Sequence, residues 1–295
     1  MKKHLPSLLI LLAGCLWGSM GLFVHSMEEA GLSNMQMVTM RGLVTSLVLF
    51  TALAAIKPSL LKIKLRHLWC FFGTGILSVI FFNYCYITTI STSSMAVAAV
   101  LLYTSPIFVM LLSRVLFKEK LTAKKWIALI LAFAGCLLVS GILSGGADLT
   151  ITAFLFGIGS GFGYALYSIF SRYAIQYGYS GWTITAYTFL FAAVGGAFLS
   201  DFNGLALAVQ DGGIPLVGLF LLFAAVTTLL PYLFYTIGLQ YTENSKAAVI
   251  VSIEPVMAAI LGFSRGERPS LIAWSGILLV LLAVLLLSLP NKKKT

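Results

Sequence analysis

Between His67 and Ser113 the chain carries no aspartate, glutamate, lysine or arginine. Similar apolar runs fill most of its 295 residues, so 60% of the residues are hydrophobic and only 9% are charged, against about 25% charged in soluble domains. Because a membrane-spanning helix needs about 20 mostly apolar residues, there is room for many spans. The strands of a membrane β-barrel alternate polar and apolar residues, whereas these runs are continuously apolar. The pattern excludes a soluble domain, a β-barrel and a nucleic-acid-binding protein, and predicts an all-α membrane protein.

Charged residues, prolines and clusters of glycine, asparagine, serine and threonine divide the chain into ten predicted transmembrane helices. The least marked boundary lies in the uncharged stretch, where the polar residues 88–94 predict a tight hairpin. The start, two lysines followed by an apolar run without a small-residue cleavage pattern, is expected to be a retained first helix. The predicted ranges are 6–25, 33–56, 67–88, 93–116, 124–143, 150–174, 181–200, 213–239, 245–263 and 270–289.

The basic residues fix the expected orientation of these helices. With ten helices and both ends on one side, sixteen lysines and arginines fall on that side, only Arg265 and Arg268 fall on the other, and Arg41 lies in the membrane. Cytoplasmic loops of membrane proteins carry the excess of positive charge, so both termini are predicted to be cytoplasmic, in a plasma or inner membrane. The sixteen are Lys2, Lys3, Lys57, Lys62, Lys64, Arg66, Arg114, Lys118, Lys120, Lys124, Lys125, Arg172, Lys246, Lys292, Lys293 and Lys294.

The two halves of the chain resemble each other at a period of about 148 residues. Each half would hold five helices, an odd number, so the second half must enter the membrane upside down relative to the first. Inverted repeats of this kind are typical of secondary transporters, because exchanging the conformations of the two halves moves the opening from one side to the other. The matching segments are 14–18 with 161–165, 93–100 with 242–249, 105–109 with 254–258, and 117–121 with 265–269.

Together these features resemble a ten-helix member of the drug/metabolite transporter superfamily, in the EamA-like group with two tandem EamA domains. The resemblance implies one five-helix domain at 6–143, an inverted one at 150–289, and transport of small organic solutes such as amino acids, other metabolites or drugs, often outward. Residues 263–267 are more polar than the run that usually precedes the second Gly-Glu pair of the family. The motifs that carry the resemblance are Trp17-Gly18-Ser19, Ser105-Pro106-Ile107, Phe117-Lys118-Glu119-Lys120-Leu121, Glu254-Pro255-Val256 and Gly266-Glu267.

Arg41 interrupts the otherwise uncharged stretch 30–56, well inside a predicted span. A charge near the membrane centre costs about 2.5–3.5 kcal/mol on insertion scales, so the side chain is expected to face other helices or a wet cavity. There it can bind a substrate carboxylate or phosphate in bidentate geometry. The structural alternative is an arginine that pairs with helix-end carbonyls or extends toward the membrane surface.

Glu254 is the only acidic residue inside a predicted span, and it precedes Pro255. A carboxyl group inside the membrane can bind and release a proton during transport, which makes Glu254 the candidate for proton coupling. The alternative is a hydrogen-bonding partner at a kink, since proline removes a backbone donor and bends the helix. Pro106 occupies the matching position in the first half, so the two prolines are either hinges or static bends.

Aromatic and polar residues within the spans are candidates for lining a substrate cavity, because a tyrosine at mid-depth needs a hydrogen-bond partner. Trp17 and Tyr164 lie on small-residue stripes whose glycines are more simply explained as close-packing seams. The predicted substrate-binding residues besides Arg41 are Trp17, Asn83, Tyr86, Tyr103, Tyr164, Tyr187, Tyr232 and Tyr235.

The sequence therefore predicts a secondary transporter that exports amino acids, carboxylates or related metabolites. No GxxxxGK[ST] loop, metal-ligand set or paired catalytic residues occur, so no cofactor, metal or catalytic site is expected. The expected partners are a small-molecule substrate, the lipid bilayer and protons; no oligomeric state is specified. A flippase for lipid-linked solutes or a drug exporter of the same fold is the rival prediction. A membrane-embedded enzyme, receptor or scaffold is disfavoured by the repeat.

Overall fold

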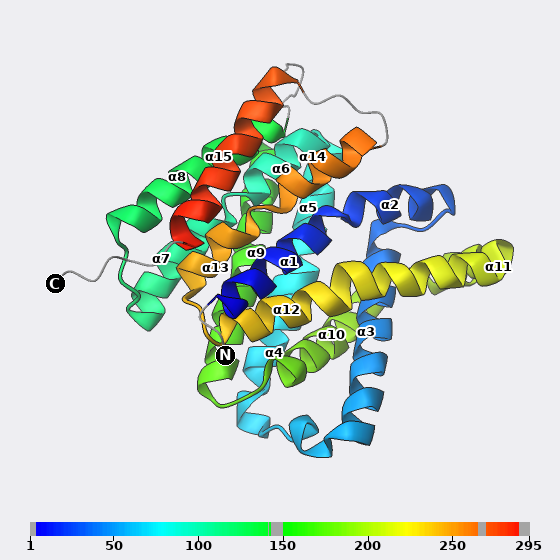
Figure 1. Ribbon diagram of the computed structural model, residues 1–295. Coiled ribbons are helices and arrows are strands. Elements are labelled where there is room, and N and C mark those ends of the chain that lie inside the picture. Colours follow the sequence, from blue (N-terminus) through cyan, green and yellow to red (C-terminus); the bar gives the residue numbers. More distant parts are fainter. Residues whose placement is uncertain (1–3, 141, 143–149, 265–269, 289–295) are drawn as a thin grey trace.

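The computed structural model describes residues 4–140, 142, 150–264 and 270–288, and every regular element among them is a helix (Figure 1). The first half contains α1 (Leu5–Gly18), α2 (Met20–Glu29), α3 (Asn34–Ile56), η1 (Pro58–Leu61), η2 (Leu65–His67), α4 (Leu68–Phe72), η3 (Gly73–Ile80), α5 (Phe81–Thr92), α6 (Met95–Leu102), α7 (Ser105–Phe117) and α8 (Ala123–Val139). The second half contains α9 (Ile151–Gln176), α10 (Gly181–Ala197), α11 (Phe202–Ala224), η5 (Ala225–Leu229), α12 (Leu230–Leu239), α13 (Asn244–Val251), α14 (Glu254–Ser264) and α15 (Leu271–Ser288).

The outer surface of these helices is apolar. Large hydrophobic side chains such as Leu47, Val115 and Ile130 are more than half exposed, which suits contact with lipid rather than water. This confirms the predicted all-α membrane class. By length and composition, seven helices are able to cross a membrane: Leu5–Glu29, Asn34–Ile56, Leu65–Thr92, Met95–Phe117, Ile151–Gln176, Phe202–Leu239 and Asn244–Phe263.

Several predicted features lie outside the described residues. The second Gly-Glu pair at 266–267 is among them, as are the ends of the predicted ranges 124–143 and 270–289. So are Lys2, Lys3, Asp148, Arg265, Arg268, Lys292, Lys293 and Lys294.

Two predicted continuous helices, 93–116 and 245–263, are each broken in the middle. The first divides into α6 and α7 at residues 103–104, and the second into α13 and α14 at residues 252–253. Each break comes just before a proline, Pro106 or Pro255, and α6 and α13 both end four residues before that proline. The reason is physical: a proline ring has no N–H to donate and collides with the carbonyl group four residues earlier.

Three other boundaries also differ from the prediction. The helix expected at 6–25 is broken at Ser19 into α1 and α2 and continues to Glu29. The helix expected at 213–239 begins at Phe202, because the Asp201 carboxylate accepts hydrogen bonds from the backbone N–H groups of Asn203 and Gly204 at 3.0 and 3.1 Å. A kink at Gly213, with a φ of 56°, lies at the predicted start. The helix expected to end at residue 88 continues to Thr92, and the hydroxyl of Thr92 donates to the Thr88 carbonyl one turn back at 2.7 Å.

Helices of the first half pack mainly against helices of the second half. The pairs with the most extensive contacts across the halves are α8 with α15, α3 with α10, α5 with α9, and α1 with α12 (Figure 1). In the first of these pairs the backbones nearly touch: a Cβ atom added to Gly135 would lie 2.7 Å from the carbonyl oxygen of Gly276. Small residues allow such close approach between membrane helices.

The two glycine stripes in α1 and α9 are packing seams. A Cβ atom added to Gly18 in α1 would lie 2.5 Å from the carbonyl oxygen of Glu254 in α14. A Cβ atom added to Gly161 in α9 would lie 2.5 Å from the Thr104 hydroxyl oxygen, at the break between α6 and α7. Both seams therefore hold a long helix tightly against a broken one, and they bring Trp17 and Tyr164 to the centre of the molecule.

We expect the substitution Gly18→Ala to destabilise the protein by about 1–3 kcal/mol, because the added methyl group meets backbone atoms that cannot move aside. The matched control is Gly21→Ala, where an added Cβ atom meets no atom within 4 Å. That change should be neutral or slightly stabilising, since alanine favours a helix over glycine. Thermal unfolding of the detergent-purified variants measures both effects, and equal melting temperatures would contradict the seam.

Candidate functional site

An aromatic cluster occupies the middle of the molecule, where α1, α9 and α12 meet. Trp17 is only 6% exposed, and its ring lies 4.9 Å from that of Tyr232, 5.6 Å from that of Tyr235 and 6.1 Å from that of Tyr164. The structure thus brings together four of the predicted site residues, which come from both halves of the chain. Together they form a polar but water-poor wall, because each tyrosine adds a hydroxyl group to an apolar ring.

Two hydroxyl groups in and beside this cluster, those of Tyr235 and Tyr167, are hydrogen-bonded to side chains of the second half. The hydroxyl oxygens of Ser168 and Tyr235 are 2.7 Å apart, and those of Tyr167 and Thr236 are also 2.7 Å apart. The buried hydroxyl of Tyr164, in contrast, forms no hydrogen bond of normal geometry among the described residues, and the polar group with which it interacts is the carboxyl group of Glu254. Tyr167 and Ser168 were not predicted. Their spacing from Tyr164, three and four residues along one helix, was the signal that placed them on the same face.

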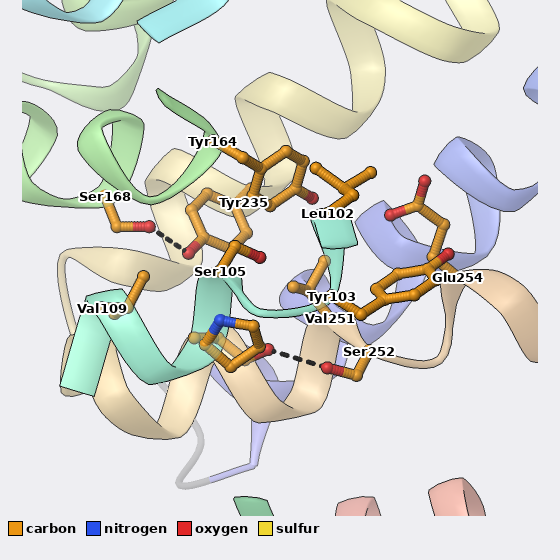
Figure 2. A pocket seen from close by; sticks show the side chains of 12 residues that line it. Leu102, Tyr103, Ser105, Val109, Tyr164, Ser168, Tyr235, Val251, Ser252 and Glu254 are labelled. Atoms are coloured by element: carbon orange, nitrogen blue, oxygen red, sulfur yellow. Dashed lines mark hydrogen bonds between the residues drawn. The ribbon is translucent and has the colours of Figure 1, made fainter. Parts of the chain in front are cut away.

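Glu254 lies at the first residue of α14 and borders a small cavity beside the aromatic cluster. Figure 2 shows Glu254 and Tyr103 on one side of this cavity and Tyr164 and Tyr235 on the other, with Ser105 between them. The free space is about 10 Å³, enough for about one water molecule. The structure therefore has this centre closed, and a metabolite can enter only after the surrounding helices move apart.

Arg41 is buried without an anionic partner. The side chain is 8% exposed; its guanidinium carbon lies 5.1 Å from the centre of the Phe223 ring, and its NH1 atom lies 3.8 Å from the sulfur of Met20. No carboxylate among the described residues forms an ion pair with it, and its Nε atom has no hydrogen-bond partner there. Electrostatic interaction with Tyr232 connects it to the aromatic cluster. A buried cation in this state can bind an anion.

Of the remaining predicted residues, some lie near Glu254 and the others form hydrogen bonds elsewhere in the structure. Tyr86 and Tyr103 lie close enough to Glu254 to interact with it electrostatically. The amide of Asn83 donates a hydrogen bond to the Val79 carbonyl of its own helix at 2.7 Å.

Tyr187 lies outside the aromatic cluster. Its hydroxyl donates to the Leu61 carbonyl at 2.8 Å, and its ring packs against Phe50 and Phe71. Of the two prolines, Pro106 borders the small cavity and Pro255 follows Glu254.

A second polar cluster, which we call the Glu119 clamp, joins the α7–α8 connection to the start of α13. One carboxylate oxygen of Glu119 accepts from the backbone N–H of Asn244 at 2.8 Å, and the other from the hydroxyl of Ser245 at 2.6 Å and its backbone N–H at 3.2 Å. Lys125 lies 2.7 Å from a Glu243 oxygen and 3.8 Å from a Glu119 oxygen. The clamp thus ties the two halves together at one end of the molecule.

Arg172 completes the Glu119 clamp from α9. Its Nε atom donates to the Asn244 side-chain oxygen at 2.7 Å, and its NH2 group donates to the Thr242 carbonyl. In the sequence, Glu119 stands out only as part of the motif at 117–121. Its aligned position in the second half was a hint, but the residues it binds lie more than a hundred positions away in the chain.

The described residues contain no group of three or more histidine, cysteine, aspartate or glutamate side chains able to hold a metal ion. Three of the four cysteines, Cys70, Cys85 and Cys136, are buried free thiols, and Cys15 is partly buried. The groups that the centre presents to a solute are the guanidinium of Arg41, the aromatic rings and the carboxyl group of Glu254.

Apolar outward faces, several membrane-crossing helices and a polar centre define a multi-pass membrane protein. The model of the EamA-like transporter family matches residues 4–141 and again residues 151–289, and the chain belongs to this family. It is a membrane transporter, like its relatives.

An uncharacterized transporter of Archaeoglobus fulgidus is 30% identical over 282 residues, which cover 94% of each chain. The uncharacterized inner membrane transporter YicL of Salmonella typhimurium is 27% identical, over 97% of this chain and 95% of its own. A solved crystal structure superposes with a TM-score of 0.76 at 17% identity, covering 95% of both chains, which indicates the same fold.

Proposed function

We propose that this protein is a secondary transporter that moves small organic metabolites, such as amino acids or other carboxylates, outward by alternating access. The observation that carries the proposal is the buried guanidinium of Arg41, which has no carboxylate partner among the described residues and lies beside the aromatic cluster. A buried positive charge is costly without a negative partner. In a transporter, an anionic group of the substrate can be that partner.

The substrate is held between Arg41 and the aromatic cluster in this proposal. A carboxylate can accept two parallel hydrogen bonds from a guanidinium, which fixes its orientation. The rings of Trp17, Tyr164 and Tyr232 then contact the apolar part of the solute. Tyr86, Tyr103 and Tyr235 complete the proposed wall. Asn83 and Tyr187 stay proposals with less support, because their polar groups already bond to backbone carbonyls.

Glu254 couples transport to protons in this proposal. It lies at the break between α13 and α14, where it borders the cavity and interacts with the Tyr164 hydroxyl. Half-helix ends near the membrane midplane are typical of ion and substrate sites in secondary transporters. The proton would bind Glu254 when the cavity is open to one side and leave it when the cavity is open to the other.

The proposed architecture has ten spans in two inverted repeats, 6–143 and 150–289. The packing supports it: α1 lies against α13 and α14, as α9 lies against α6 and α7, and each contact is made at a glycine seam before a proline. The two breaks, at Pro106 and Pro255, are then matched hinges. With ten spans and the basic residues inside, both termini are cytoplasmic.

The Glu119 clamp is the closed cytoplasmic gate of this proposal. It joins the two halves at an end of the spans that is rich in lysine and arginine, and Glu119 caps the start of α13, the first part of a broken helix. Opening toward the cytoplasm requires α13 to separate from the α7–α8 connection, which breaks these hydrogen bonds.

We expect Glu119→Ala to shift the protein toward the cytoplasm-open state. Hydrogen bonds to a buried carboxylate contribute about 1.5–3 kcal/mol, so the equilibrium should move by a factor of at least about ten. The control is Glu243→Gln, which removes only an ion pair of a side chain that is 56% exposed, and such pairs contribute about 0–1 kcal/mol.

The measurement is the rate at which a membrane-impermeant maleimide, added from the cytoplasmic side, labels a single cysteine introduced as Ser252→Cys. Ser252 borders the central cavity and is 4% exposed. The four native cysteines are replaced by alanine in this background. Faster labelling in Glu119→Ala than in Glu243→Gln supports the gate, and equal rates would contradict it.

The test of the proposed function is flux into proteoliposomes made with the purified protein. A mixed pool of labelled amino acids and carboxylates is offered with and without a pH gradient. We expect uptake of at least one pool member, increased by the gradient. If no pool member is transported, the proposed substrate class is wrong, and lipid-linked solutes and drugs are the next class to assay.

A further inference from the structure

A second cavity, of about 190 Å³, lies between the connection that follows α3 and the turn between α9 and α10. It shares no lining residue with the small cavity beside Glu254. It is much larger than the space at the centre and is mainly polar. Two lysines and no carboxylate are among the residues that line it, so its charge is positive. The polar side chains that line it are those of Ser59, Lys62, Lys64, His67, Tyr177, Tyr179, Ser180 and Thr183.

Hydrogen bonding around His67 leaves one donor directed at this cavity. Arg66 donates from Nε to the Nε2 atom of His67 at 3.1 Å, so a neutral His67 ring carries its proton on Nδ1. That atom lies 2.9 Å from the hydroxyl oxygen of Tyr179, which also accepts from the backbone N–H of Lys64 at 2.9 Å. With the His67 proton on Nδ1, the Tyr179 oxygen accepts twice, which leaves its own proton for a ligand of the cavity that Tyr179 lines.

This arrangement is rigid as well as positive. His67 is 6% exposed and stacks on Tyr177 with ring centres 4.0 Å apart and planes 6° apart. Across the cavity, Thr183 donates to the Leu60 carbonyl at 2.8 Å. The cavity therefore has fixed walls, contributed by both halves of the chain, and two longer lysine side chains at its mouth.

The surroundings place the cavity at the level of lipid headgroups. Trp69 and Tyr177 lie with ring centres 6.4 Å apart and are 41% and 46% exposed, while Leu65 is 81% exposed. Exposed tryptophan and tyrosine are typical of the boundary between the apolar membrane and water. Basic pockets at this depth meet the phosphate groups of anionic lipids, which lysines near the surface attract.

We propose that this cavity binds a phosphate group, supplied by the headgroup of an anionic phospholipid of the surrounding bilayer. Lys62 and Lys64 neutralise the charge, and the Tyr179 hydroxyl donates to a phosphate oxygen. The bound headgroup bridges the α3–α4 connection and the α9–α10 turn, and stabilises the folded protein because it binds only where both segments are in place.

The test uses the full chain in uncharged detergent micelles, with the melting temperature followed as lipid is added. Phosphatidylglycerol is compared with phosphatidylcholine and with inorganic phosphate. The variant is Lys62→Gln with Lys64→Gln, and the control is Lys57→Gln, an exposed lysine of the same connection that does not line the cavity. Lys62 and Lys64 are both exposed, so their replacement should leave the fold intact. A second variant, Lys62→Glu, reverses one of the two charges.

We expect phosphatidylglycerol to raise the melting temperature of the wild type and of Lys57→Gln. In the double variant the concentration that gives half of the shift should rise at least tenfold. A full shift with inorganic phosphate alone supports the phosphate site and assigns a soluble source. Equal shifts with phosphatidylcholine, or an unchanged response in both Lys62 variants, overturn the proposal.

Discussion

Arg41→Met is expected to abolish transport of carboxylates while making the protein more stable. Methionine keeps an unbranched apolar side chain in the space between Met20 and Phe223, and removes a charge that no carboxylate among the described residues compensates. Replacing buried charges by apolar residues is often stabilising. Once the lost contact between the guanidinium and the Phe223 ring is subtracted, the free energy of unfolding should rise by about 1–2 kcal/mol. Flux should fall at least about 100-fold, since two charge-assisted hydrogen bonds to the substrate are lost.

This opposite movement of stability and flux separates a substrate role for Arg41 from a structural one. An arginine retained to support the fold would give a lower melting temperature with Arg41→Met. Arg41→Lys is the matched control, because it keeps the charge but not the planar pair of donors, and it should retain part of the flux. A variant Arg41→Met that melts lower and still transports contradicts the proposed site.

Glu254→Gln is expected to remove the response of flux to a pH gradient. Glutamine has the shape of a protonated glutamate but cannot release the proton, so the carrier would no longer couple solute movement to proton movement. Solute exchange at equal pH on both sides should survive, because the cavity keeps its size and its other lining residues.

Proteoliposomes loaded with labelled substrate measure both activities in one preparation. Gradient-driven accumulation is compared with exchange for the wild type and for Glu254→Gln. If the variant accumulates substrate like the wild type, then Glu254 is a structural partner at the kink. The loss of both activities together would also contradict a role limited to proton coupling.

Much of the fold follows from the sequence because long apolar runs leave a chain few choices in a membrane. The runs predicted helices at nearly every place where the structure has them. The helix breaks were harder to predict, since proline is tolerated inside membrane helices. Only the backbone geometry indicates that α6 and α13 end before Pro106 and Pro255, and that the helix at 202–239 starts with a cap at Asp201. The number of spans and the inversion of the repeat stay predictions.

Sequence patterns located the aromatic centre better than the contacts at the ends of the molecule. Trp17, Tyr164 and Tyr232 come together because each is on the inner face of a long helix next to a seam of small residues. Tyr187 was predicted by the same reasoning but lies outside the centre. Its hydroxyl donates to the carbonyl of Leu61, which belongs to the segment that connects α3 and α4. The Glu119 clamp depends on contacts between distant segments that no local pattern describes.

The central claim is that an anionic solute crosses this protein by binding at Arg41. Its most direct test is counterflow of the labelled pool into proteoliposomes containing the wild type or Arg41→Met, at equal pH on both sides and with equal amounts of folded protein. We expect the wild type to take up a carboxylate and the variant to take up none above the level of empty liposomes. Equal carboxylate uptake by the two proteins would contradict it.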